Sequence, residues 1–333
     1  MSSPEIRKKK LIQDMSEPVR LDRSLTDWLD GNYVDLNANP RSFNAGTLMI
    51  PLLGIALYYI STFLVVWAFM AILFREGIYV ADIMRIISRY SIHISIFAAI
   101  IQIVMFIVLL KRCRRRAIPY VFTRSPRAID LLAAIGSVPV LIGVSLVWDL
   151  LVTSLAEHFA FWDKVLSDYM TLIETAFVPR SGMFVQIISL VILVPIAEEL
   201  LFRGIILSEL KAAMPKWAAI LLTGLIFAVV HGNVYQGVYT FVAGVYFGYL
   251  YVFSESILIP ILAHMLFNFV GGILPYLVDL DDKNASLIYL GVIFVGLILG
   301  VVAFVIQILR RRNTITVARN SELGRSISAA GRI

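Results

Sequence analysis

The feature that most constrains this 333-residue chain is a series of long apolar stretches that contain almost no charged residues. Amphipathic helices of soluble proteins alternate apolar and polar faces, and these stretches do not. Most of them have the ~20 apolar residues that a helix needs to cross a bilayer. We therefore predict an all-α fold, a polytopic membrane helix bundle of about eight transmembrane helices. Their expected positions are 48–74, 91–110, 129–153, 183–203, 217–231, 238–253, 257–277 and 286–309.

The charged residues lie mainly between these stretches. The formal net charge is +6, a value that also occurs in nucleic-acid-binding proteins. Here, however, Lys and Arg are concentrated on alternate loops, as they are on the cytoplasmic loops of membrane proteins. With an even number of spans, this asymmetry predicts that both termini are cytoplasmic. We expect a multi-pass integral membrane protein, in the cell membrane if the source is bacterial. Its expected partner is the lipid bilayer, and we expect no nucleic-acid partner.

The same pattern divides the chain into five expected parts. The only cysteine, Cys113, excludes intrachain disulfides and a cysteine-based metal site. The mixed charges of 154–182 suggest an interfacial helix. The parts are a polar cytoplasmic segment (1–47), the first transmembrane helices with the interfacial segment (48–182), a core with intramembrane ionisable residues (183–278), the last transmembrane helix (279–309) and a basic cytoplasmic tail (310–333).

Ionisable side chains lie inside the apolar stretches of the second half of the chain. Such residues are costly in a bilayer, so they usually face a bundle interior or a water-filled cavity and indicate a functional site. They are Glu198, Glu199 and Arg203 in the sequence PIAEELLFRGIIL, then His231 and His264, with the polar Asn268 four residues after the last.

The spacing suggests different roles for the two glutamates. Glu199 and Arg203 are four residues apart and can form an ion pair on one helix face. Glu198 lies ~100° around the helix and cannot easily share that arginine. Glu198 is thus the carboxylate left over for chemistry. If a turn joins the fourth and fifth spans near 211–216, Glu198 and His231 both lie ~20 Å from it along their helices, whereas His264 lies only ~12 Å from its own turn.

Two kinds of hydrolytic site suit these residues. In the first, Glu198, His231 and His264 bind one divalent metal such as Zn²⁺ and leave a position open for water. In the second, Glu198 and His231 activate a water directly, while His264 and Asn268 donate hydrogen bonds to the developing oxyanion. Both arrangements hydrolyse an amide, and the sequence leaves the choice open.

Three motifs in this region resemble one known family. They are EELLFR (198–203), FAVVH (227–231) and HMLFN (264–268), in this order on successive apolar segments. They are similar to the E-E-x-x-x-R, F-x-x-x-H and H-x-x-x-N/D motifs of the CAAX-protease and bacteriocin-processing intramembrane endopeptidases, also called the type II CAAX prenyl endopeptidase or abortive-infection family. The resemblance covers 183–278, which we therefore interpret as a CAAX-protease-like catalytic core.

The resemblance implies a membrane protease whose active site lies inside the bilayer. By this similarity Glu198 activates water, Glu199 and Arg203 support the structure, and Phe227 packs against the site. His231 assists the water or binds a metal, and His264 with Asn268 steadies the oxyanion or completes the site. The implied partner is a membrane-associated protein or peptide substrate, either a lipidated CAAX protein or a bacteriocin-type peptide.

Two other functions are weighed against a protease. A proton-coupled transporter could use Glu198 and the histidines as a proton relay. Transporters, however, tend to contain internal repeats with broken helices, and this chain has no visible repeat. A non-catalytic scaffold or immunity protein could keep the motifs for structure alone. Gly244 and Gly248 form a G-x-x-x-G pattern that we expect to pack inside the monomer.

Overall fold

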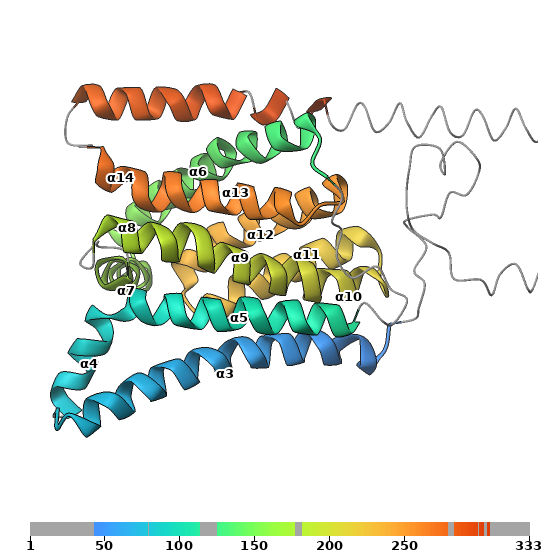
Figure 1. Cartoon of the computed structure of the whole chain (residues 1–333). Coiled ribbons are helices and arrows are strands. Elements are labelled where there is room, and N and C mark those ends of the chain that lie inside the picture. The colour runs from blue at the N-terminus through green and yellow to red at the C-terminus, as the bar shows by residue number, and fades with distance from the viewer. Residues whose placement is uncertain are drawn as a thin grey trace, which may run out of the picture.

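The computed structural model describes residues 43–78, 80–113, 125–176, 182–278, 283–298, 300–302 and 305–306. The expected cytoplasmic tail (310–333), nearly all of the expected N-terminal segment (1–47) and much of the basic loop after Cys113 lie outside these ranges. Within them the fold is all-α, as predicted, and Figure 1 shows a bundle of long helices whose axes are roughly aligned, with neighbours that run in opposite directions among them.

The helices carry the labels of Figure 1, which begin at α3. Segments with the wider π-helical turn carry η labels. In chain order they are α3 (Ala45–Arg75), α4 (Val80–Arg89), α5 (Ser91–Cys113), α6 (Ala128–Ala156), α7 (Ala160–Ala176), α8 (Met183–Gln186), η2 (Ile187–Leu193), α9 (Val194–Glu199), η3 (Leu200–Leu207), α10 (Ser208–Lys211), α11 (Lys216–Val230), α12 (Val234–Ser254), α13 (Leu258–Asn268), η4 (Phe269–Ile273) and α14 (Leu274–Leu277).

Seven helices in the described part of the chain are long and apolar enough to cross a membrane. The protein is therefore a multi-pass integral membrane protein. The remaining predicted span corresponds to α11, which is apolar but has only 15 residues. At 1.5 Å per residue its length is about 22 Å, shorter than the ~30 Å hydrocarbon core. The seven helices are Ala45–Arg75, Ser91–Arg112, Ala128–Ala156, Met183–Lys211, Val234–Ser254, Leu258–Leu277 and Lys283–Val302.

The helix Met183–Lys211 lies in the middle of the bundle, and we call it the central helix. Figure 1 shows α3 and α5 on one side of it and α13 with α6 on the other. The paired helices α11 and α12 pack together and also contact η3. Residues 200 to 210 of the central helix are all buried, so this is the part of the molecule most fully removed from lipid.

The central helix changes its helical form along its length. It is π-helical in η2, α-helical in α9 and π-helical again in η3. Pro195 lies at the start of α9. Proline has no backbone N–H and clashes with the preceding turn of a regular α-helix, and a widened turn before it makes room for the proline ring. Widened π turns are frequent at functional sites.

Glycines allow α11 and α12 to approach closely. A Cβ atom added to Gly244 would lie 3.0 Å from the Cα of Gly224. A Cβ added to Gly248 would lie 3.3 Å from Ile220 of the same neighbouring helix. The prediction that this G-x-x-x-G pattern packs inside the monomer is confirmed.

The helix α7 lies across one end of the bundle, where Figure 1 shows it along its axis. Aromatic side chains attach it to α12: the ring of Tyr169 stacks on that of Tyr235 at 3.9 Å, and its hydroxyl is 3.2 Å from that of Tyr239. The Tyr235 hydroxyl donates a hydrogen bond to Asp149 of α6. Burial raises the pKa of Tyr169, so this hydroxyl stays neutral. Location in the membrane interface remains a prediction for α7.

Candidate active site

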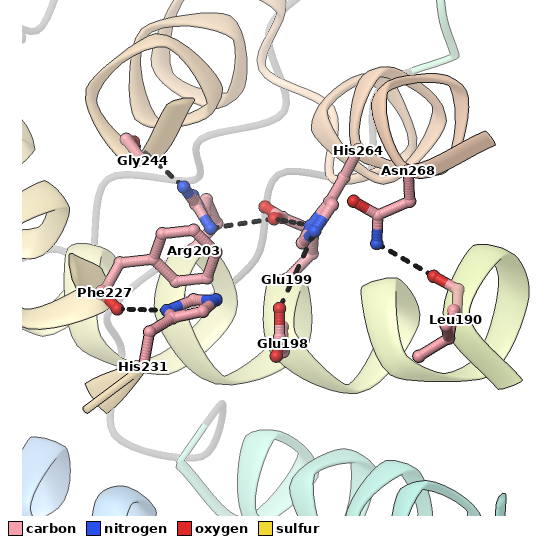
Figure 2. A network of polar contacts seen from close by, with 9 residues as sticks. All are labelled: Leu190, Glu198, Glu199, Arg203, Phe227, His231, Gly244, His264 and Asn268. Carbon is pink, nitrogen blue, oxygen red and sulfur yellow. Dashed lines mark hydrogen bonds and ion pairs between the residues drawn. The ribbon is translucent and has the colours of Figure 1, made fainter. Parts of the chain in front are cut away.

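Glu199 and Arg203 form the predicted ion pair in the interior of the bundle. Nη1 of Arg203 donates to Oε1 of Glu199 at 2.8 Å, and neither side chain is exposed. Nη2 of Arg203 donates to the backbone carbonyl of Gly244 at 2.9 Å. Arg203 therefore joins the central helix to α12 through a charged and a neutral acceptor (Figure 2).

Two aromatic rings complete the surroundings of this arginine. The guanidinium carbon of Arg203 lies 4.9 Å from the ring centre of Phe227 and 5.3 Å from that of Phe247. Both phenylalanines are buried. Their rings offer cation–π contacts that are strongest where water is absent. Phe227 thus packs against the site residues.

His264 connects the ion pair to Glu198. Its Nδ1 lies 2.8 Å from Oε1 of Glu199, the same oxygen that Arg203 contacts. Because a carboxylate only accepts, Nδ1 of His264 carries the proton of this hydrogen bond. Its Nε2 lies 3.7 Å from Oε2 of Glu198, beyond direct hydrogen-bond distance.

Glu198 has a different environment from its neighbour. Its side chain is 10% exposed, and no residue that the structure describes is hydrogen-bonded to its carboxylate. Glu199 instead uses one oxygen for both a guanidinium and an imidazole. A buried carboxylate with no hydrogen-bond donor of its own remains available to accept a proton.

His231 lies at the end of α11, where its tautomer is fixed by a backbone group. Its Nδ1 lies 2.7 Å from the carbonyl oxygen of Phe227, so Nδ1 is the donor and the neutral ring has its lone pair on Nε2. Figure 2 shows this second nitrogen on the side of the ring toward Glu198. The Phe227 ring lies near both imidazoles, with its centre 4.7 Å from that of His231 and 5.9 Å from that of His264.

Asn268 contacts the central helix rather than the histidines. Its Nδ2 donates to the carbonyl oxygen of Leu190 at 2.8 Å. In a π-helical turn that carbonyl would accept from the backbone N–H five residues later, which is the position of Pro195. Since proline has no N–H, the amide of Asn268 supplies the missing donor. One amide hydrogen of Asn268 is left for any further role.

The donor arrangement does not fit the metal alternative. Three ligands of one ion must point at a common centre at ~2 Å. Within the part of the chain that the structure describes, no three His, Cys, Asp or Glu side chains are grouped in this way. We therefore assign no catalytic step to a metal ion at these residues.

Several participants were not singled out as site residues from the sequence. Gly244 was interpreted only as a packing residue, and Phe247 and Leu190 were not considered. The proline five residues after Leu190 was a usable signal for a freed carbonyl group. No local pattern indicates that the carbonyl of Gly244 accepts from Arg203, because that contact joins residues 41 positions apart.

The region that contains this network matches a known protein family. Residues 180–270 match the family described as type II CAAX prenyl endopeptidase Rce1-like. This segment is similar to that family. It includes every predicted site residue from Glu198 to Asn268, whereas α3, α5 and α6 precede it. No curated protein and no solved structure matches the chain.

The Rce1-like match implies a peptidase and supports a CAAX-type intramembrane protease kind of function. It also implies a membrane-associated protein or peptide as substrate. This agrees with the buried polar network between membrane-spanning helices, which a purely structural bundle does not need.

Proposed function

We propose that this protein is an intramembrane endopeptidase in which Glu198 activates the water that hydrolyses a peptide bond. The observation that carries the proposal is the contrast between two adjacent carboxylates. Glu199 is held by Arg203 and His264, while no described residue is hydrogen-bonded to Glu198. One glutamate therefore organises the site and the other is free for proton transfer.

In this mechanism the water oxygen attacks the carbonyl carbon of the scissile bond while one of its protons passes to Glu198. The free Nε2 of His231 accepts a hydrogen bond from the same water and orients it. The carbonyl oxygen becomes an oxyanion, which protonated Nε2 of His264 stabilises. As the C–N bond breaks, Glu198 returns its proton to the leaving nitrogen.

Hydrogen bonding keeps the three groups in these roles. Glu199 holds Nδ1 of His264, which directs Nε2 toward Glu198. The carbonyl of Phe227 does the same for His231. In the fully charged state, protonated His264 and Arg203 balance the two glutamates, so the buried site has no net charge. The second amide hydrogen of Asn268 is the remaining candidate donor to the oxyanion.

We further propose that the end of the bundle that carries Lys211 and Lys216 faces the cytoplasm. Arg112 lies in the last turn of α5, and Arg127 immediately precedes α6. Positively charged residues at such helix ends are enriched on the cytoplasmic side of membrane proteins. The substrate class that fits is a protein whose membrane-associated end can reach a site ~20 Å along the central helix from Lys211. A reporter fused after Ile333 tests this orientation, since extracytoplasmic readout would contradict it.

The test of the function compares protein termini in cells that express wild type or Glu198→Gln at equal membrane abundance. Glutamine keeps the shape of the side chain but does not take up a proton, so the proposal predicts new termini with wild type alone. The same pair of proteins is then assayed in lipid nanodiscs with a farnesylated CAAX reporter peptide. Identical terminus profiles and equal hydrolysis would refute the enzymatic proposal and favour a carrier or scaffold.

A further inference from the structure

The helix α3 lies outside the Rce1-like segment but runs along the central helix. Figure 1 shows that the two point in opposite directions, and the start of the central helix is at the end of the bundle where α3 finishes. Gly54 is the point of close approach: a Cβ added there would lie 2.8 Å from Leu201 and 3.5 Å from Ile205. Contacts of α3 with α10 agree with this antiparallel arrangement.

This contact fixes which residue of α3 is level with Glu198. Residues three or four apart lie on one helix face, one turn from each other. One turn after Gly54 is Tyr58. In the opposite direction along the central helix, one turn before Leu201 is Glu198. The antiparallel packing thus places Tyr58 beside the carboxylate that we assign to water activation.

The Tyr58 side chain supports this placement. It is partly buried and packs against the hydrophobic cluster that includes Leu201 and Phe227. No residue that the structure describes is hydrogen-bonded to the Tyr58 hydroxyl, Glu198 included. The two groups therefore lie at one level of the bundle without a direct hydrogen bond, an arrangement in which one water can bridge them.

A buried amide holds the backbone at this position. Gln102 of α5 is 4% exposed, and its Nε2 lies 3.2 Å from the carbonyl oxygen of Tyr58. The same Nε2 contacts Ser61 at 3.2 Å and Thr62 at 3.0 Å, the hydroxyls of which also donate to that carbonyl. Neutral polar side chains of this kind hydrogen-bond across membrane helices and hold them together. Here it ties α3 to α5 at the level of the site.

We propose that Tyr58 is a positioning residue that, with Glu198, holds the water molecule that attacks the peptide bond. This inference rests on the proposed function. The Tyr58 hydroxyl exchanges hydrogen bonds with the water and neither gains nor loses a proton. The O–H bond of the water breaks toward Glu198, and its oxygen forms the new bond to carbon. The first half of the chain then contributes directly to a site whose three motifs lie in the second half.

The chain offers a matched control in the adjacent residue. Tyr59 carries the same hydroxyl, which donates to the carbonyl of Val230 at 3.1 Å on the exposed side of α3. Tyr58→Phe and Tyr59→Phe remove one oxygen each from neighbouring positions. The full-length variants are compared in lipid nanodiscs with the farnesylated CAAX reporter. We expect kcat of Tyr58→Phe to fall about 10- to 100-fold with KM and melting temperature unchanged, because the water and not the substrate loses its partner. Tyr59→Phe is expected to keep its kcat.

A second readout is independent of turnover. The infrared carboxylate band of ionised Glu198 is identified by its loss in Glu198→Gln. Tyr58→Phe is expected to shift this band, because the water that joins the two groups loses one partner, and Tyr59→Phe is expected to leave it in place. An unshifted band in Tyr58→Phe overturns the proposal whatever the activity.

The kinetic outcomes separate this inference from the proposed function. If the reporter is hydrolysed in a Glu198-dependent reaction and Tyr58→Phe keeps full kcat, the role of Tyr58 is overturned and the peptidase stands. If neither the reporter nor a cellular protein is cleaved in a Glu198-dependent reaction, both proposals fail. A loss of kcat that comes with a matching loss of melting temperature and an unshifted band shows a structural role and also overturns the inference.

Discussion

Replacement of Arg203 by methionine removes the cation from the buried network while it keeps an apolar side chain of comparable length. Methionine retains contact with the rings of Phe227 and Phe247, so little packing is lost. The changes that matter are polar. Glu199 loses the donor at 2.8 Å, and the carbonyl of Gly244 loses the donor at 2.9 Å.

The expected loss of stability follows from these two contacts. Removal of one partner of a buried ion pair costs about 3–5 kcal/mol, because the other charge stays buried without compensation. An unsatisfied buried carbonyl costs about 1–3 kcal/mol more. The two losses share one side chain and are not fully additive. We therefore expect the free energy of unfolding of Arg203→Met to be at least ~3 kcal/mol below that of wild type. A loss of this size is enough to lower its abundance in the membrane.

The double variant Glu199→Gln with Arg203→Met provides the control. Glutamine removes the uncompensated charge, and its amide oxygen can still accept from Nδ1 of His264. The double variant is expected to regain most of the stability that the single variant loses. Melting temperature in nanodiscs and abundance per cell are the measurements. A single variant as stable as wild type, or a double variant no better than the single one, would refute the ion-pair argument.

Two further changes test the packing and the backbone. Gly244→Ala places a Cβ 3.0 Å from the Cα of Gly224, and overpacking of this kind costs about 1–3 kcal/mol. Gly237→Ala on the same helix meets only a carbonyl at 3.7 Å, so its melting temperature is expected to stay close to that of wild type, and equal losses in the two variants would contradict this. Asn268→Leu leaves the carbonyl of Leu190 without a donor and is expected to cost about 1–3 kcal/mol. Addition of Pro195→Ala restores a backbone N–H there and recovers part of the loss, a recovery that thermal melts of the single and double variants measure.

Much of the candidate site could be predicted from the sequence because its charged residues lie in an otherwise apolar stretch. Glu198, Glu199 and Arg203 stand out in an apolar stretch, and the spacing of four residues alone predicted the ion pair that the structure contains. The choice of Glu198 as the free carboxylate came from its angle around the helix. Its catalytic role stays a prediction until Glu198→Gln is measured.

Contacts between helices that are far apart in the sequence could not be predicted from such patterns. Depth along the helices suggested a poor match for His264, yet its Nε2 lies 3.7 Å from Glu198. Asn268 was expected at the oxyanion, and the structure directs one of its amide hydrogens to Leu190. Turn positions read from sequence ignore tilt and the change between α-helical and π-helical turns.

The sequence by itself determined the environment and the local geometry. Long uncharged stretches require a bilayer, because their apolar surface has no other solvent, and a helix is the form that satisfies every backbone group within one segment. Residues four apart share a face in any such helix. These consequences depend only on near neighbours along the chain.

The tertiary structure decided which groups meet across helices. The hydrogen bond from Arg203 to the carbonyl of Gly244, the two phenylalanine rings beside the guanidinium, and the level of Tyr58 with Glu198 all depend on how closely helices approach and in which register. Those quantities are set by the sum of many weak packing contacts between residues far apart in sequence. No short motif encodes that sum, so the free carboxylate could be identified from the sequence but the partners that surround it could not.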